Sequence, residues 1–331
     1  MHENTSLIKV KNLKKWFAIR TGFFTSLISA KQFFVRAVDD VSFDIKKGEI
    51  FGLAGESGSG KTTTGRLLLR LVEPTEGKII FEDRDITSIG EKEFKPFRRR
   101  MQIVFQDPYE SLNARMTIQS IIEEPLVIQG LVGEDMAGRV QKALEDVQLT
   151  PPEEFLFRYP HELSGGQRQR VAMARALILS PEFIVADEPV SMLDVSIRAE
   201  ILNLLVDLRN KYGTSFLYIT HDLALARHIC DRLAVMYLGK IVEMSNVDQV
   251  MLEPLHPYTN ALISAVPVPD PTSKRVEVVI KGEIPSPINP PSGCRFHTRC
   301  PLYIGEICRT KEPPLVEVKK GHYVACHLHV K

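Results

Sequence analysis

Residues 55–62 read Gly-Glu-Ser-Gly-Ser-Gly-Lys-Thr, which is the spacing of a phosphate-binding loop. Glycines let backbone N–H groups turn inward around an anion at the start of a helix. The Lys61 ammonium would reach the β- and γ-phosphates of a nucleotide, and the Thr62 hydroxyl would bind Mg²⁺. The sequence therefore predicts a nucleotide site. Its predicted contacts are Gly55, Ser57, Gly58, Gly60, Lys61, Thr62 and Thr63.

Two adjacent carboxylates, Asp187 and Glu188, end an apolar run at residues 183–186. Successive side chains on a strand point to opposite faces, so the two acids can serve different roles. Asp187 can hold Mg²⁺, directly or through water, and Glu188 can polarise the water that attacks a γ-phosphate. A strand that ends in two acids is common on protein surfaces. Beside a phosphate loop, we predict the catalytic role.

Three further polar features have both a functional and an ordinary interpretation. Leu-Ser-Gly-Gly-Gln at residues 163–167 precedes a helix, where it would form an anion site or only an N-cap and turn. His221 comes just after the apolar run at residues 216–219 and would alone be an ordinary loop histidine. Gln106 would likewise be an ordinary turn residue. None of the three predicts a function by itself.

The elements that must position these residues alternate between strands and helices. Residues 50–54, 183–186 and 216–219 are short apolar runs typical of buried parallel strands. Residues 196–212, between the last two runs, have apolar side chains at helical spacing. A strand, a helix and a strand in this order predict a parallel sheet with right-handed crossovers. The predicted fold class is therefore α/β.

Helical patterns without a buried strand predict a helical subdomain at about residues 110–180. The patterns lie at residues 118–129, 134–147 and 167–179. Near the amino terminus, residues 7–10 and 41–45 alternate as half-buried strands do, and an irregular stretch, 21–34, separates them.

The composition shifts after about residue 253. Ten of the 21 prolines lie between Pro254 and Pro301, so this part must be extended and rich in loops. We predict one large domain over residues 1–253 and a small C-terminal extension over residues 254–331.

Composition excludes several other classes of protein. The chain has 331 residues, of which 44% are hydrophobic and 25% charged, as in ordinary globular proteins. A net charge of +1 provides no overall field for nucleic acid, and we expect no nucleic-acid partner. No apolar run is long enough to span a membrane, and no secretory signal begins the chain. These features predict a soluble, intracellular protein.

The motifs together, in their order along the chain, resemble one family: the nucleotide-binding subunits of ABC (ATP-binding cassette) transporters. The pieces are the phosphate loop, Gln106, Leu-Ser-Gly-Gly-Gln, Asp187-Glu188, Ser-Met-Leu-Asp at 191–194, and His221. The resemblance covers roughly residues 5–245. It implies a P-loop ATPase core with a parallel sheet, an antiparallel β-subdomain and a helical subdomain. It further implies that two such subunits pair head to tail around two ATP molecules.

The resemblance also implies a role for each motif. Ser164 and Gly166, within the set Ser164, Gly165, Gly166 and Gln167, would contact the γ-phosphate held by the other subunit. His221 would steady the γ-phosphate and the attacking water. Gln106 would sense Mg²⁺ and couple to a membrane partner.

Two assignments concern the edges of the implied site. Asp194 would lie at the dimer seam, and Trp16, or failing it Phe17, would stack on the adenine ring. Met192 departs slightly from the family, in which alanine is more usual at that position.

A closer resemblance is to the ATPases of dipeptide and oligopeptide importers. It rests on residues 101–113, on His-Pro-Tyr-Thr at 256–259 and on Gly-Glu-Ile-Pro-Ser-Pro at 282–287. It implies a peripheral protein on the cytoplasmic face of the cell membrane. The implied partners are two transmembrane permease subunits, a second related ATPase (a heterodimer, with a homodimer possible) and, indirectly, an extracytoplasmic solute-binding protein.

Other functions stay open from the sequence. Some importers of this branch carry oligosaccharides or nickel. A soluble ABC ATPase acting on DNA or ribosomes would carry a long coiled coil or a second cassette, and this chain has neither. An iron–sulfur sensor regulated by ATP is a third alternative.

Four of the five cysteines fall near the carboxyl terminus: Cys294, Cys300, Cys308 and Cys326. Four thiolates suffice for a metal site, but their spacing matches neither common ferredoxin patterns nor paired zinc knuckles. His297, His322, His327 and His329 could replace cysteines as zinc ligands. The family resemblance favours a [4Fe-4S] cluster, with Zn²⁺ or free thiols as alternatives.

Overall fold

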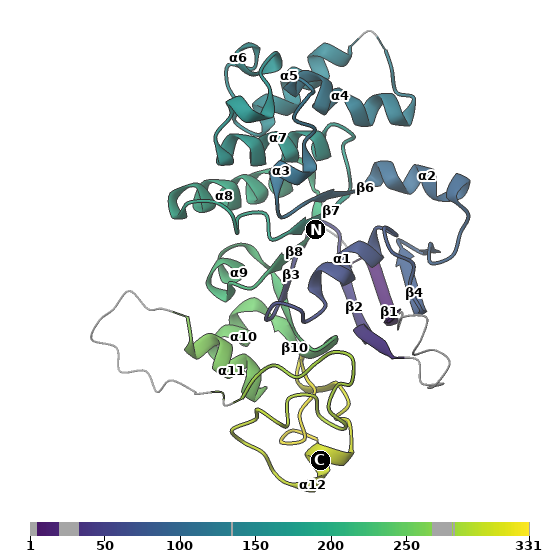
Figure 1. The fold of residues 1–331 in the computed structure, drawn as a ribbon, viewed down its shortest axis with the longest axis vertical. Helices are drawn as coiled ribbons and strands as arrows, with labels where there is room; N and C mark the ends of the chain where they lie inside the picture. Colours follow the sequence, from purple (N-terminus) through teal and green to yellow (C-terminus); the bar gives the residue numbers. More distant parts are fainter. Residues whose placement is uncertain (1–4, 20–32, 134, 267–279, 281, 331) are drawn as a thin grey trace, which may run out of the picture. The chain divides into compact units, whose positions relative to one another are not determined.

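A computed structural model describes residues 5–19, 33–133, 135–266, 280 and 282–330 (Figure 1). The irregular stretch predicted at residues 21–34 lies almost wholly outside the described residues. The chain divides into two compact units. The first unit comprises Met1–Leu7, Ile45–Ile50 and Ser88–Ile219, and the second comprises Ile8–Asp44, Phe51–Thr87 and Thr220–Lys331.

Parallel strands form the sheet of the first unit. β7 (Phe183–Asp187) pairs in parallel with β6 (Met101–Val104) and with β8 (Ser215–Thr220). Every residue of β7 and β8 is buried, which explains their uninterrupted apolar runs. α8 (Val195–Tyr212) connects them. The predicted strand–helix–strand pattern is thus confirmed, and the carboxyl ends of β6 and β7 meet at one edge of the sheet.

Residues 88–219 of the first unit are otherwise mainly helical where they are described, and Figure 1 shows α4, α5, α6 and α7 gathered together. α4 starts where Thr117 accepts a hydrogen bond from the Ser120 amide, and it ends at Gly130 in the left-handed conformation. The helices are α2 (Glu91–Arg100), α3 (Pro108–Ser111), α4 (Ile118–Gln129), α5 (Met136–Asp146), α6 (Glu153–Leu156), a 3₁₀ turn (Pro160–Glu162) and α7 (Gly165–Leu177).

Arginines of α5 and α7 bind this group of helices together. Arg175 on α7 donates to the Glu124 carboxylate of α4 at 2.6 Å and to the Ser111 carbonyl at 3.0 Å. Arg139 on α5 donates to the Ile178 carbonyl at 2.9 Å. The predicted helical patterns are confirmed as helices, with ends shifted by two or fewer residues.

The second unit contains an antiparallel sheet in the order β2-β1-β4-β5. These strands are β1 (Ser6–Ala18), β2 (Phe34–Lys46), β4 (Glu76–Phe81) and β5 (Arg84–Asp85). The half-buried strands predicted at residues 7–10 and 41–45 are confirmed, and each extends further than its alternating pattern.

The second unit also contains strands in the order β3-β9-β10-β12-β11. β3 (Ile50–Ala54) and β9 (Arg232–Tyr237) are parallel, whereas β10 (Lys240–Asn246), β12 (His322–Val324) and β11 (Val316–Lys319) pair antiparallel. Helices of this unit are α1 (Lys61–Leu68), α9 (Leu223–Ile229), α10 (Val247–Leu252), α11 (Pro257–Ser264) and α12 (Glu306–Thr310). Among the described residues, no helix combines the length and apolarity that crossing a membrane requires.

The C-terminal extension joins the second unit through the buried carboxylate of Glu243 on β10. This carboxylate accepts hydrogen bonds from the amides of Leu255 and His256, both at 2.8 Å, and from His322 Nε2 on β12 at 2.7 Å. Glu243 and His322 are fully buried. The described part of the extension is mostly loop, as its prolines predict. Its strand β12 pairs with β10 and so joins the extension to the sheet.

His256 makes this region sensitive to acid. Its Nδ1 accepts the Tyr258 amide at 3.1 Å and so caps α11. Burial lowers the pKa of His256 to about 4, against the attraction of Glu243, which raises this pKa; the charge of His329 lowers it further. Between pH 6.5 and pH 4 the unfolded chain binds a proton at His256 that the folded chain does not, so the free energy of unfolding falls as pH falls.

We predict that His256→Asn, which keeps a capping acceptor and removes the titration, reduces this acid sensitivity. Chemical denaturation at pH 7 and pH 4.5 should show the parent losing about 2 to 3 kcal/mol more than the variant. Equal losses in the two proteins would contradict the prediction.

Candidate functional site

The phosphate loop joins β3 to α1 within the second unit, and two of its glycines lie against neighbouring strands. A Cβ at Gly55 would lie 2.2 Å from the Met236 carbonyl oxygen, and one at Gly60 would lie 2.2 Å from the Ala37 carbonyl oxygen. Gly58 has a φ of +76° and faces open space. Backbone approach thus requires glycine at 55 and 60, and the left-handed conformation favours it at 58.

Lys61 lies across this loop with only 4% of its surface exposed. Its ammonium donates to the Gly55 carbonyl at 2.7 Å and to the Glu56 carbonyl at 2.9 Å. No side chain caps α1, which begins at Lys61. A buried cation at the start of a helix, beside turned backbone amides, is suited to binding phosphate. Thr62 and Thr63 follow in the first turn of α1.

In the first unit, Glu188 and Gln106 lie close together at the edge where β6 and β7 end. Gln106 Nε2 donates to Glu188 Oε2 at 3.4 Å. The Glu188 backbone has a φ of +46° and its amide donates to the Ile219 carbonyl at 3.0 Å. Such a left-handed turn at a non-glycine residue re-aims the side chain, as functional sites often require. Asp187, at the end of β7, is buried.

Leu-Ser-Gly-Gly-Gln forms the start of α7. Ser164 Oγ accepts the Gln167 amide at 3.3 Å, while Gln167 Oε1 accepts the Ser164 amide at 3.0 Å. This is a capping box, so the ordinary interpretation as an N-cap is confirmed. A Cβ at Gly166 would lie 2.7 Å from the Ile197 side chain of α8, so close packing explains this glycine. Gly165 lies between Ser164 and Gly166 in the first turn of α7.

Asp194 and His221 are both exposed, in the first and second unit respectively. Asp194 precedes α8, and the side chains of Met192 and Val195 beside it are 64% and 80% exposed. Exposed apolar side chains next to each other are suited to an interface. His221 precedes Asp222, whose carboxylate caps α9.

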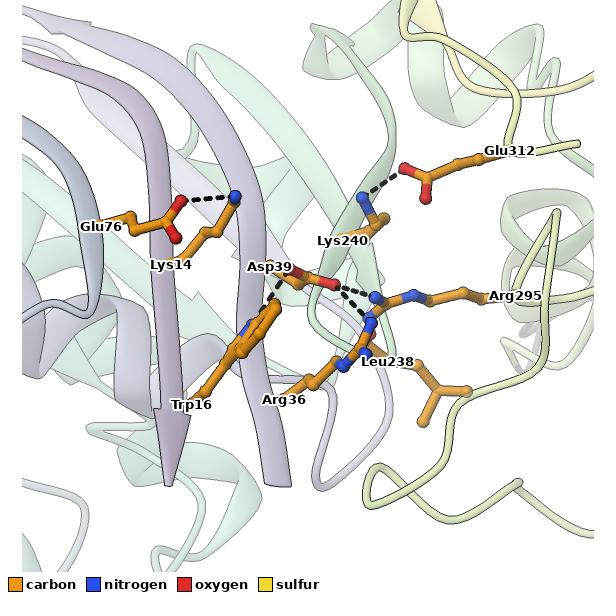
Figure 2. A network of polar contacts seen from close by, with 9 residues as sticks. All are labelled: Lys14, Trp16, Arg36, Asp39, Glu76, Leu238, Lys240, Arg295 and Glu312. Carbon is orange, nitrogen blue, oxygen red and sulfur yellow. Dashed lines mark hydrogen bonds and ion pairs between the residues drawn. The ribbon is translucent and has the colours of Figure 1, made fainter. Parts of the chain in front are cut away.

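Trp16 on β1 is half-buried, whereas Phe17 is 39% exposed. The Trp16 indole N–H donates to Asp39 Oδ1 at 3.1 Å, and the Arg36 guanidinium lies over its ring at 4.6 Å (Figure 2). The Lys14 ammonium lies 6.0 Å from the centroid of the same ring, and the Phe34 ring centroid lies 6.2 Å away. Cations and an aromatic ring thus surround the indole, whose stacking on adenine stays a prediction.

The four C-terminal cysteines are free thiols that lie close enough to influence one another. Burial raises the pKa of Cys294 to about 12, and the charges of Cys326, Cys300 and Cys308 raise it further. Burial likewise raises the pKa of Cys300 and Cys326. The Cys294 amide donates to the Cys308 carbonyl at 2.8 Å, so these two cysteines are neighbours. Yet in the described part of the chain no group of three or more His, Cys, Asp or Glu side chains has the geometry to hold a metal ion.

The sequence did not predict the roles of four residues that contact the phosphate loop or Asp39: Glu56, Tyr258, Arg295 and Arg299. Arg299 pairs with Glu56 of the phosphate loop, and Arg295 pairs with Asp39. Tyr258 belongs to the His-Pro-Tyr-Thr run that carried the resemblance to peptide importers, and this run was the one available signal.

This fold and this phosphate loop define an ATP-binding cassette. The ABC transporter family matches residues 38–191, and the family described as oligopeptide/dipeptide transporter, C-terminal region, matches residues 242–308. The chain is 48% identical over 328 residues to the oligopeptide transport ATP-binding protein AppF of Bacillus subtilis, covering 98% of each chain. The chain belongs to the ABC transporter family of ATP-binding proteins and carries the C-terminal region of its oligopeptide/dipeptide branch.

Solved structures agree with this assignment. A dimeric ATP-binding cassette in a post-hydrolysis state, bound to ADP and Pi, is 30% identical with a TM-score of 0.62, over 72% of this chain and 98% of that one. CbiO1 of Clostridium perfringens, part of an ABC transporter complex, is 27% identical with a TM-score of 0.64, over 75% and 92% of the two chains. The predicted fold class and family are confirmed.

The capping box allows the structural role of Ser164 to be separated from a role at the nucleotide. Ser164→Ala removes the cap and should lower the free energy of unfolding by about 1 kcal/mol. Ser164→Asp restores a capping acceptor, but its charge would repel a γ-phosphate. We therefore expect the Asp variant to regain stability in urea denaturation while ATP hydrolysis, measured as phosphate release with the partner subunits present, stays at least tenfold reduced. Recovery of both properties would mean that Ser164 only caps α7.

Proposed function

We propose that this chain is the ATP-hydrolysing subunit that powers a membrane importer of di- or oligopeptides. The observation that carries the proposal is the buried Lys61, placed by two tightly packed glycines at the start of α1. The peptide cargo is supported by the C-terminal region match and by relatives such as AppF. Oligosaccharides or nickel are the alternative cargo, and their import would use the same ATPase.

The proposed reaction is hydrolysis of ATP to ADP and phosphate. Glu188 accepts a proton from water, the water oxygen bonds to the γ-phosphorus, and the bond from the γ-phosphorus to the bridging oxygen breaks. Lys61 stabilises the β- and γ-phosphate oxygens, and His221 steadies the γ-phosphate and the water.

Oxygen donors suited to Mg²⁺ are present in each unit: the Thr62 hydroxyl, the Asp187 carboxylate and the Gln106 amide. When bound, the ion would neutralise charge that builds on the phosphate oxygens. The remaining proposed contacts with ATP are the amides and hydroxyls of Gly55, Ser57, Gly58, Gly60 and Thr63, together with Trp16 at the adenine.

We propose that the functional unit is a head-to-tail dimer. Ser164, Gly165, Gly166 and Gln167 of one subunit would complete the site of the other, and Asp194 would lie at the seam. The exposed Met192 and Val195 beside Asp194 support an interface at this position. A second related ATPase is the proposed partner, with a second copy of this chain as the alternative.

A groove of about 230 Å³ in the first unit supports coupling to a membrane partner. Its apolar lining includes Val104, Phe105, Pro125, Ile128 and Leu179, from β6, α4 and the end of α7. We propose that a cytoplasmic helix of a permease subunit occupies it, next to Gln106. The chain would thus act as a peripheral subunit on the cytoplasmic face, organised as a cassette over residues 1–253 with an extension over 254–331.

Replacing the proposed general base should abolish turnover and preserve binding. Glu188→Gln keeps the hydrogen bond geometry but cannot accept a proton, so ATP turnover should fall at least 10²-fold, while the dissociation constant for ATP changes less than threefold. Phosphate release and calorimetric binding measure the two quantities. Glu200→Gln, at an exposed partner of Arg170, is the matched control and should retain turnover. Turnover within threefold of the parent in Glu188→Gln would refute the assignment.

The same variant reports the dimer, because ATP that cannot be hydrolysed holds the sandwich closed. Glu188→Gln with Mg²⁺ and ATP should run as a dimer with a co-expressed ATPase in size-exclusion chromatography. A dimer formed by this chain alone would support the homodimer.

We further propose that the four gathered cysteines form one thiolate site, with a [4Fe-4S] cluster as the first candidate and Zn²⁺ as the second. Their number and proximity support this, although the described side chains are not arranged around an ion. Protein purified without oxygen should contain about four irons per chain by metal analysis and should show a broad absorption band in the visible spectrum. One zinc and no colour would favour zinc, and neither metal would mean free thiols.

A further inference from the structure

Glu56, the second residue of the phosphate loop, is held at each of its polar groups. Its amide donates to the Tyr258 hydroxyl at 2.9 Å, and its carbonyl accepts from the Lys61 ammonium at 2.9 Å. Its carboxylate accepts from the Arg299 guanidinium, at 3.0 Å from Nη1 and 3.5 Å from Nη2. Two of these partners come from the C-terminal extension, so the first turn of the loop is set by residues more than 200 positions away in sequence.

Arg299 and the tyrosines on its side of these contacts are largely shielded from water, while the Glu56 side chain is 26% exposed. The Arg299 side chain is 9% exposed, and it also donates to the Tyr237 hydroxyl at 3.4 Å. The rings of Tyr237, Tyr258 and Phe296 pack together with centroids 4.7 to 5.3 Å apart. Burial raises the pKa of both tyrosines above the ordinary value, so both hydroxyls stay neutral. A charge-assisted hydrogen bond in such surroundings is stronger than one on the surface.

A second contact runs from the extension to β1 and β2. Figure 2 shows Arg295, Arg36 and Trp16 converging on Asp39. The Arg295 guanidinium donates to the Asp39 carboxylate and to the Leu238 carbonyl, and Asp39 accepts the Trp16 indole N–H at 3.1 Å. The side chains of Arg295 and Asp39 are 6% and 8% exposed. The aromatic residue proposed for adenine is thus held through Asp39 by Arg295.

Both arginines lie on one short turn, residues 294–300, which we call the arginine turn. It begins at Cys294, whose amide donates to the Cys308 carbonyl at 2.8 Å, and it ends at Cys300. Within it the His297 amide donates to the Cys294 carbonyl at 3.0 Å. Because one turn carries both arginines, it holds the phosphate loop and the Trp16 strand at the same time.

We propose that the arginine turn is part of the nucleotide site. Arg299, together with Tyr258, is a positioning residue that fixes Glu56. Arg295 is a positioning residue that fixes Trp16 through Asp39. The inference rests on the proposed function. Arg299 has an electrostatic task besides a geometric one: it neutralises a carboxylate within the loop that binds phosphate. Without Arg299 the Glu56 carboxylate would repel ATP, since like charges at short range disfavour binding.

The electrostatic role of Arg299 can be told from a merely structural one, because removing the Glu56 charge should restore the ATP affinity that the loss of Arg299 lowers. We expect Arg299→Ala to raise the dissociation constant for Mg-ATP about tenfold, and the KM with it, while kcat stays within about twofold. Adding Glu56→Gln to Arg299→Ala removes the unpaired carboxylate and should restore most of the affinity. Calorimetry on the full chain in a Glu188→Gln background gives the binding constants, and phosphate release with the partner subunits gives KM and kcat.

Arg309→Ala is the matched control, because Arg309 lies in the same extension and pairs locally with Glu306 on α12. It should bind ATP as the parent does. If Arg299→Ala fails to fold, Tyr258→Phe decides, since it removes one hydroxyl and should raise the dissociation constant about fivefold, with thermal unfolding as the check on folding. Unchanged ATP affinity in Arg299→Ala, or in Tyr258→Phe, or a double variant no better than Arg299→Ala, would overturn the inference.

Lys61→Ala separates this inference from the proposed function. If Lys61→Ala loses ATP binding while Arg299→Ala binds ATP with the affinity of the parent, only the inference about the arginine turn is overturned. Parental binding in Lys61→Ala would overturn the proposed function, and the inference with it.

Discussion

The close backbone approach of the phosphate loop to β2 and β9 is the constraint on which the site depends. A Cβ added at Gly55 or at Gly60 would lie 2.2 Å from a carbonyl oxygen on one of these strands. Only glycine permits that approach, and only then does Lys61 begin α1 with its ammonium inside the loop. β9 serves twice, because it supplies the Met236 carbonyl and also Tyr237, whose hydroxyl meets Arg299. The loop and the C-terminal extension are therefore supported by the same strand.

Local patterns predicted much of the fold and pointed to most residues of the candidate site, whose roles stay predictions. β3 and α4 lie at the predicted residues because their signals are contiguous: a run of five mostly apolar residues in one case, and apolar residues at helical spacing in the other. The phosphate loop was predictable for the same reason, since its chemistry lies in one run of residues. At residues 163–167 the sequence left two interpretations, and the capping box confirms the ordinary one without deciding the other.

Contacts between distant residues were not predictable. Arg295 meets Asp39 across 256 positions, and Arg299 meets Glu56 across 243. Neither pair has a spacing that a pattern could reveal, because the meeting depends on how the strands are ordered. The prolines predicted a loop-rich extension, but they carry no information on the pairing of β12 with β10. The four cysteines predicted a cluster by number, and a thiol count does not fix the positions of the sulfur atoms.

Buried charge explains why the extension belongs to the second unit rather than being a detachable tail. Glu243 and His322 are fully buried together, and Asp39 is buried against Arg295. Removing Arg295 would leave the Asp39 carboxylate buried without its guanidinium partner, and breaking a buried ion pair in this way costs about 3–5 kcal/mol. The carboxylates of Glu243, Asp39 and Glu56 all lie in the part predicted as the large domain, and each one has a cationic or hydrogen-bonding partner in the extension. The second unit therefore carries two buried acids, Glu243 and Asp39, and the half-buried Glu56, and the extension supplies a partner to each. Glu56 lies within the phosphate loop, and Asp39 contacts Trp16.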